Sequence, residues 1–174
     1  ANLDAWMKPR ARKVSPAALG VLGARAEVRY QPKGVVGVMT PWNFPVQLAI
    51  DAIAGAFAAG NCVMVKPSEF TPITSALLAQ LFDLYFDEEE IAFVLGGPEV
   101  GAAFAGLAFD HLIFTGATSV GRHVMRAAAD NLTPVTLELG GKSPVVIGRS
   151  ADIAKTAARV MAGKTMNAGQ VVTV

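Results

Sequence analysis

From Gly34 onward, the chain alternates short apolar runs with longer stretches of helical spacing, and this alternation constrains its fold more than any other feature. The apolar runs predict strands over residues 35–39, 62–65, 91–95, 111–114 and 135–138, with a further short strand over 144–147. The remaining stretches predict helices over residues 45–59, 72–85, 99–105, 119–130 and 151–161. Strands that alternate with helices of such lengths form βαβ units with right-handed crossovers, so a parallel sheet is expected.

The expected fold class is therefore α/β, with a Rossmann-like parallel sheet of about five strands flanked by helices. Gly60 is expected to end the first helix, because glycine adopts the left-handed conformation that closes helices. Thr71 and Ser150 are candidate N-caps of later helices. The segment before residue 34 is expected to be irregular, apart from an edge or hairpin strand over 26–30.

Composition narrows the class of protein. The 174 residues are 52% hydrophobic and 17% charged, which is typical of a globular chain, and a net charge of +1 gives no reason to expect nucleic-acid binding. A basic cluster at residues 8–13 and an acidic run at 87–90 are both expected to be solvated surface. The single cysteine, Cys62, is expected to be a small core residue on a strand, and it agrees with a reducing, cytoplasmic compartment. The sequence shows neither a signal peptide nor an apolar run long enough to span a membrane.

Polar and glycine-rich segments follow the predicted strands at their carboxyl ends. These segments are 41–43, 66–69, 96–98, 115–116 and Glu138. In open parallel sheets, ligands bind outside the carboxyl ends of the strands. The convergence of these segments predicts a nucleotide or cofactor site at that edge.

The stretch 114–121 reads as a strand, a glycine turn and a helix start. A helix N-terminus offers free backbone N–H groups, so a pyrophosphate fits there, although any tight turn from a strand into a helix could carry this spacing. Lys66-Pro67-Ser68-Glu69 also follows a strand, and its Lys and Glu could bind ribose hydroxyls. Glu69 would repel a 2′-phosphate, which favours NAD over NADP. The alternative is a simple polar turn.

Two side chains are candidates for chemistry. Asn43 could point an amide N–H at a developing oxyanion, and Glu138, which stands before two glycines, could act as a general base. Each also has a structural alternative: an Asn that holds a turn, and a Glu in a surface ion pair. His111 and His123 are expected at the edge of the core and on the surface, and no metal-ligand cluster is apparent.

Read together, these segments resemble the aldehyde dehydrogenase superfamily. The resemblance rests on three motifs that occur in the family's order: Pro41-Trp42-Asn43-Phe44-Pro45, Glu138-Leu139-Gly140-Gly141-Lys142 and Asn167-Ala168-Gly169-Gln170. The turn at 95–100 and the stretch 132–138 are most similar to the class 3 and coniferyl aldehyde dehydrogenase group. The resemblance runs from about Trp6 to Gln170.

The resemblance implies NAD, with NADP as the alternative cofactor, and oxidation of an aldehyde to an acid. Asn43 would hold the thiohemiacetal oxygen and Glu138 would activate the hydrolytic water. The implied cofactor-binding residues are Thr40, Pro41, Trp42, Lys66, Ser68, Glu69, Gly97, Gly101, Phe114, Thr115, Gly116, Ala117, Val120, Leu139 and Gly140. Many members have Ser where this chain has Ala117, so one phosphate hydrogen bond would be missing.

The resemblance also divides the chain. Residues 1–33 would include an oligomerisation strand, 34–150 an NAD(P)-binding domain, and 151–174 the start of a truncated catalytic domain. The family's nucleophilic Cys would fall at Val172, so the chain alone would not catalyse oxidation of the aldehyde. Alternatives are a non-catalytic nucleotide-binding fragment and a structural fragment. The implied partners are an aldehyde and a second subunit in a homodimer.

Overall fold

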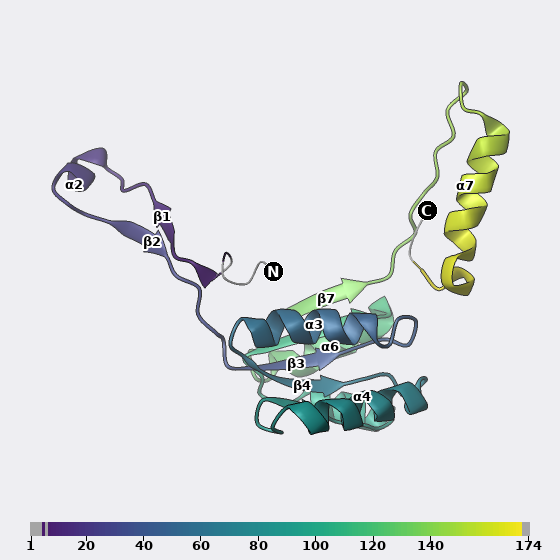
Figure 1. Cartoon of the computed structure of the whole chain (residues 1–174), viewed down its shortest axis with the longest axis horizontal. Helices are drawn as coiled ribbons and strands as arrows, with labels where there is room; N and C mark the ends of the chain where they lie inside the picture. The colour runs from purple at the N-terminus through teal and green to yellow at the C-terminus, as the bar shows by residue number, and fades with distance from the viewer. Residues whose placement is uncertain (1–4, 6, 172–174) are drawn as a thin grey trace.

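The computed structural model describes residue 5 and residues 7–171. Its centre is a five-stranded parallel sheet with the order β5-β4-β3-β6-β7, flanked by helices, which confirms the predicted fold class (Figure 1). The strands are β3 (Val35–Met39), β4 (Cys62–Lys66), β5 (Ile91–Phe93), β6 (His111–Gly116) and β7 (Val135–Leu139). The helices between them are α3 (Gln47–Ala58), α4 (Pro72–Tyr85), α5 (Pro98–Ala105) and α6 (Thr118–Ala129).

The strand order reverses at β3. The chain first builds outward from β3 through β4 to β5, and then returns to the other side of β3 to form β6 and β7. Loops on the two sides of such a switch point diverge and leave a crevice at the carboxyl ends of β3 and β6. The fold therefore fixes where a ligand site can lie.

Each face of the sheet has its own core. Helices α3 and α4 cover one face, where Ile53 and Leu78 pack on valines of β3 and β4. Helices α5 and α6 cover the other face, where Phe104 and Val124 pack with Leu112 of β6. The central strands β3 and β4 are largely buried, which is why they read as nearly continuous apolar runs in the sequence, whereas the edge strand β7 carries exposed Thr136 and Glu138.

Two positions of the unit require glycine for different reasons. A Cβ at Gly37 of β3 would lie 2.6 Å from the Phe109 ring, so only glycine lets that ring cross the strand. Gly60 has a φ of 85° just after α3, as predicted for a residue that ends a helix.

An antiparallel hairpin precedes the sheet and projects away from it (Figure 1). It consists of β1 (Arg10–Arg12), the short helix α2 (Ala17–Val21) and β2 (Ala26–Val28). The expected hairpin strand is confirmed over Ala26–Val28. The expectation that the rest is irregular is wrong for β1 and α2, because β1 pairs with β2 although its own residues lack apolar alternation.

A second arm follows β7 and carries α7 (Ile153–Thr165) and the 3₁₀ helix η1 (Met166–Gly169) (Figure 1). The predicted strand over 144–147 is wrong: the segment is exposed, and no strand in the described part of the chain lies beside it. Helix α7 begins after Asp152, whose carboxylate accepts a 3.0 Å hydrogen bond from the Lys155 N–H, so Asp152 and not Ser150 is the cap.

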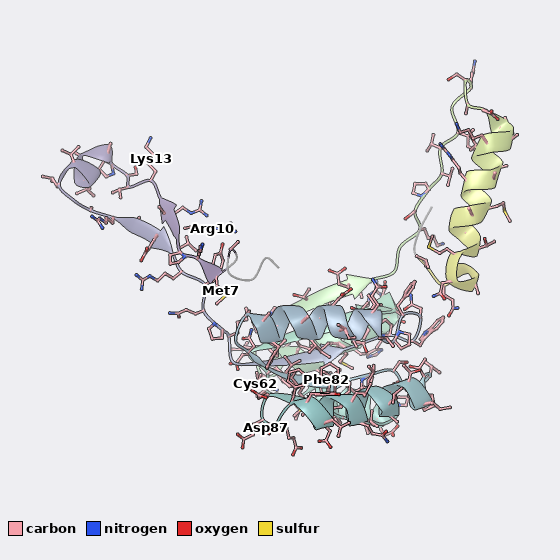
Figure 2. The ribbon with its side chains drawn as sticks, in the orientation of Figure 1. Met7, Arg10, Lys13, Cys62, Phe82 and Asp87 are labelled. Carbon is pink, nitrogen blue, oxygen red and sulfur yellow. The ribbon has the colours of Figure 1, made fainter. Side chains whose placement is uncertain are left out.

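Two further expectations are corrected in part. Cys62 lies on a strand as predicted, but at its first residue, where its side chain is exposed and not in the core (Figure 2). Thr71 is the N-cap residue of α4, yet its hydroxyl makes no capping bond and faces the Ser68 carbonyl at 3.5 Å. The acidic run 87–90 is an exposed turn, as expected. Among the described residues, no helix combines the length and apolar character needed to cross a membrane.

Candidate functional site

Two adjoining cavities lie at the carboxyl ends of the strands, where the strand order reverses. The β4-side cavity has a volume of about 660 Å³ and reaches from β4 to the slot between α5 and α6. The β7-side cavity has a volume of about 880 Å³ and reaches from β7 to the end of the second arm. The residues common to both are Pro41, Trp42, Thr115, Gly116 and Ala117. The turns after β3 and β6 thus form the boundary between two compartments of one site.

An ion pair stands on the wall of the β4-side cavity. Lys66 ends β4, its side chain is only 6% exposed, and its Nζ lies 2.7 Å from Oε2 of Glu69. This hydrogen bond lowers the pKa of Glu69, against the opposing effect of partial burial. The pair therefore presents a carboxylate acceptor and an ammonium donor side by side, which suits vicinal hydroxyl groups.

A buried hydroxyl lies on the same wall. Thr40 follows β3 and is 7% exposed, and its Oγ1 has no hydrogen-bond partner within the described residues. Its backbone N–H is satisfied by the Lys66 carbonyl at 3.2 Å, so the hydroxyl alone is left over. Buried polar atoms are rarely unpaired, and one that lines a cavity points to a polar ligand.

The far end of the β4-side cavity is an apolar slot between α5 and α6. Small side chains line it, together with Val120 and Val124, and Gly101 lies next to Lys66, where a Cβ would be 3.7 Å from Lys66 Cε. Such a slot accepts a flat apolar group. Gly97, predicted here, is not among the lining residues: it is the N-cap residue of α5.

The turn from β6 into α6 lies between the compartments. Ala117 is the N-cap residue of α6, and its side chain provides no cap for the first backbone N–H groups of this 12-residue helix. Phe114, Thr115 and Gly116 of β6 line the same cavity. These N–H groups and the helix dipole favour an anionic group.

Glu138 lies in the β7-side cavity. In the sheet it is the direct neighbour of Thr115, because β6 and β7 pair in parallel register. Its side chain is exposed at the cavity wall, next to Leu139 and Gly140. A carboxylate placed in this way can accept a proton from a water molecule in the cavity.

Asn43 joins the first loop of the site to the second arm. Its Nδ2 donates to the Gln170 carbonyl at 2.8 Å, and its own carbonyl accepts from Asn167 Nδ2 at 2.8 Å. An amide nitrogen carries two hydrogens, so Asn43 can serve this contact and still donate to a ligand. Asn167 and Ala168 both have positive φ angles, 48° and 56°, which is uncommon for residues other than glycine.

The two cavities bring the predicted residues together, with two exceptions. Gly97 lies outside both, and Val172 lies outside the described residues. Lining residues that the sequence did not single out include Leu48, Phe70, Ala102, Ser143 and Lys164. His123 is exposed as expected, yet it also lines the slot one turn after Val120, a helical spacing that could have indicated it. No group of three or more potential metal ligands occurs in the described part of the chain.

Several curated proteins are similar to this chain in sequence. "Probable coniferyl aldehyde dehydrogenase" of Caulobacter vibrioides is 66% identical over 170 residues, which cover 98% of this chain and 35% of the relative. Coniferyl aldehyde dehydrogenase of a Pseudomonas species is 61% identical over 95% of this chain and 34% of its own length. The chain thus spans about a third of the curated relatives it matches.

Solved structures share the fold. The substrate-bound AldH of Staphylococcus aureus superposes with a TM-score of 0.92 at 37% identity, over 98% of this chain and 37% of that one. The Mycobacterium tuberculosis aldehyde dehydrogenase complexed with NAD+ gives 0.82 at 37% identity, over 95% and 33%. Residues 4–174 also match the family model described as "Aldehyde dehydrogenase family". On its sequence and its fold alike, this chain belongs to the aldehyde dehydrogenase family.

Proposed function

We propose that this chain is the cofactor-binding part of an NAD(P)-dependent aldehyde dehydrogenase that oxidises an aromatic, coniferyl-type aldehyde to the carboxylic acid. The observation that carries the proposal is the β4-side cavity. It combines the Lys66–Glu69 pair, a Thr40 hydroxyl with no partner in the described part of the chain, a helix N-terminus and an apolar slot. Relatives named for coniferyl aldehyde support the substrate class.

The residues present fit a dinucleotide. Lys66 and Glu69 would bind the hydroxyls of the adenosine ribose, the slot beside Gly101 and Val120 would take the adenine, and the N-terminus of α6 would face the pyrophosphate. The nicotinamide, when bound, supplies the hydride acceptor. NAD is favoured, because the ionised Glu69 would repel the extra phosphate of NADP.

In the β7-side cavity, Asn43 would donate a hydrogen bond to the oxygen of the thiohemiacetal, and Glu138 would take a proton from the water that hydrolyses the thioester. The family's nucleophile position falls at Val172, which has no thiol. We therefore expect the chain alone to bind cofactor without turnover, because covalent catalysis needs the thiolate. The proposal also includes residues 34–150 as the cofactor-binding domain, a homodimer and a cytoplasmic location.

Calorimetric titration with NAD+ and NADP+ tests the proposal. We expect NAD+ to bind more tightly than NADP+. Glu69→Gln should weaken NAD+ binding about tenfold, because it removes a charged hydrogen-bond partner, and it should reduce the preference for NAD+ over NADP+. Asp83→Asn, which removes one exposed carboxylate on α4, is the matched control. Equal binding by wild type and Glu69→Gln would contradict the assignment of the ribose site.

A turnover assay with coniferyl aldehyde and NAD+ tests the nucleophile. We expect no NADH from the chain, and none from Val172→Cys alone, because residues outside this chain complete the catalytic domain of the relatives. NADH formation by the unsubstituted chain, with its mass confirmed, would show that the reaction does not depend on a thiol at this position.

A further inference from the structure

The slot between α5 and α6 is apolar except for one imidazole. Its lining from the two helices consists of Pro98, Gly101, Ala102 and Ala105 of α5 and Val120, His123, Val124 and Ala127 of α6. Among these lining residues, only His123 has a side chain with hydrogen-bonding atoms. Apolar walls accept a flat ring in any orientation, whereas an imidazole can distinguish one edge of that ring from another.

His123 borders the open side of the slot. The four lining residues of α6 share one face of the helix, because residues three and four apart are neighbours on a helix surface. At the inner edge of this face, Val124 is only 2% exposed and packs in the same core as Phe104 of α5. His123 lies at the outer edge and is exposed. Apolar contacts therefore close the inner side of the slot, and the imidazole stands where the edge of a bound ring would face outward.

The position of His123 along α6 determines which part of a bound purine it can reach. Helix α6 follows β6, so it begins at the carboxyl edge of the sheet, where Lys66 and Glu69 also stand. Val120 lies in the first turn of the helix, and His123 is three residues, about 4.5 Å, further along its axis. A purine whose ribose is held by the Lys66–Glu69 pair has its six-membered ring on the side remote from the ribose. That ring therefore reaches the level of His123.

The imidazole of His123 is free to make such a contact. It forms no hydrogen bond with another described residue, whereas Nε2 of His111 lies 2.8 Å from Thr136 Oγ1. A neutral imidazole has one donor N–H and one acceptor nitrogen, so it can accept a hydrogen bond from an amino group.

We propose that His123 is a specificity-determining residue that recognises the 6-amino group of the adenine. A ring nitrogen of His123 accepts a hydrogen bond from this amino group, while Val120 and Val124 contact the purine ring. The slot thereby selects adenine by the polarity of its edge as well as by its flat shape. This inference rests on the proposed function, because it takes the ligand of the β4-side cavity to be an adenine dinucleotide.

A double-mutant cycle between the side chain and the base tests the inference. The two ligands are NAD+ and nicotinamide purine dinucleotide, in which a hydrogen atom replaces the 6-amino group. The two proteins are the unsubstituted chain and His123→Leu, which has an apolar side chain at this position. In calorimetric titrations, we expect the unsubstituted chain to bind NAD+ about fivefold more tightly than the purine analogue, because the analogue lacks the hydrogen bond. His123→Leu should bind the two ligands with affinities within about twofold of each other.

Two control variants separate recognition of the amino group from general effects on the slot. Val120→Ala shortens an apolar side chain in the same slot, so it should weaken both ligands by the same factor and leave the preference for NAD+ unchanged. Met125→Ala changes a side chain of α6 that is 58% exposed and does not line the cavity, so it should leave both affinities unchanged. Circular dichroism checks that each variant folds.

The failure of this inference can be told apart from a failure of the proposed function. If NAD+ binds and Glu69→Gln weakens it, but the unsubstituted chain binds the purine analogue equally well, His123 does not recognise the amino group. The same conclusion follows if His123→Leu keeps the full preference for NAD+. If neither dinucleotide binds, both the proposed function of the cavity and this inference are wrong.

Discussion

Apolar side chains are buried in the α/β unit of residues 34–139 but exposed in the two arms that leave it. All the buried hydrophobic residues of the described chain lie between Val36 and Ala128. The arms instead expose theirs, with Val21 88% exposed in the hairpin and Val146 90% exposed after β7. The unit therefore holds a self-contained core, while the arms are shaped by local hydrogen bonds and by the places where they join the unit.

The largest contrast is expected from truncating one leucine in each region. Leu112 is fully buried in β6, and Leu112→Ala should lower the free energy of unfolding by about 2–5 kcal/mol, because it removes apolar contacts and leaves a cavity. Leu22→Ala in the hairpin should change it by less than about 0.5 kcal/mol. Urea denaturation measures both, and similar losses would show that the hairpin is part of the cooperative core.

The junction between the hairpin and the unit should respond next. Asn61 Oδ1 accepts from the backbone N–H groups of Lys33 and Gly34 at 2.6 and 3.1 Å, and Nδ2 donates to the Ala56 carbonyl at 2.8 Å. Asn61→Ala leaves these groups unpaired, and we expect a loss of about 2–3 kcal/mol in urea denaturation.

The control for the junction is Asn131→Ala, which removes one exposed hydrogen bond, to the Gly106 carbonyl. It should lower the free energy of unfolding by about 1 kcal/mol or less. If the two alanine variants lose the same stability, Asn61 is not a fixing point for the hairpin.

A smaller and local effect is expected where the second arm meets the site. Asn167→Ala removes the bond to the Asn43 carbonyl, and hydrogen exchange over residues 166–171 should become faster while global stability changes by less than about 1 kcal/mol. Asn167→Gly removes the same bond but tolerates the positive φ angle, so it should retain more protection than Asn167→Ala. Unchanged exchange in both variants would show that other contacts hold the arm.

The smallest expected effect is a pH dependence that arises in the α/β unit. Burial, with a lesser contribution from Lys33, lowers the pKa of His111, whose Nε2 lies 2.8 Å from Thr136 Oγ1. The neutral ring is therefore favoured in the folded state. Its stabilising contribution is present above the ordinary imidazole pKa of about 6.5, falls as the pH drops below that value, and is lost below the lowered folded-state pKa.

His111→Gln should consequently make the free energy of unfolding less dependent on pH between about 7 and 5. His123→Gln, on the exposed face of α6, is the matched control, since it removes an imidazole elsewhere in the unit. A steeper profile in His111→Gln would mean that the charged ring is the form favoured by the fold.

The sequence was most informative inside the α/β unit. Each of the five sheet strands could be predicted from its apolar run. The run is clearest in β3 and β4, which are largely buried, and it is interrupted in the edge strand β7, where Thr136 and Glu138 are exposed. The secondary structure of the arms was harder to predict. Strand β1 depends on pairing with β2, and the apolar run at 144–147 has no strand to pair with among the described residues. Cys62 shows the same limit on a smaller scale: its strand was predictable, but its exposure depends on which neighbours cover the strand's first residue.

For the site, the residue types of the loops and the fold class predicted a cofactor site at the carboxyl ends of the strands, and the two cavities found there are lined by Lys66, Glu69, Thr115 and Glu138 among others. Tertiary structure alone decided that Lys66 is buried against Glu69, that the Thr40 hydroxyl finds no hydrogen-bond partner among the described residues, and that Asn43 bonds to residues more than 120 positions away. The physical reason is that local patterns report how a segment meets its immediate neighbours. Ion pairing, burial of a polar atom and long-range hydrogen bonds arise only when distant segments are packed together.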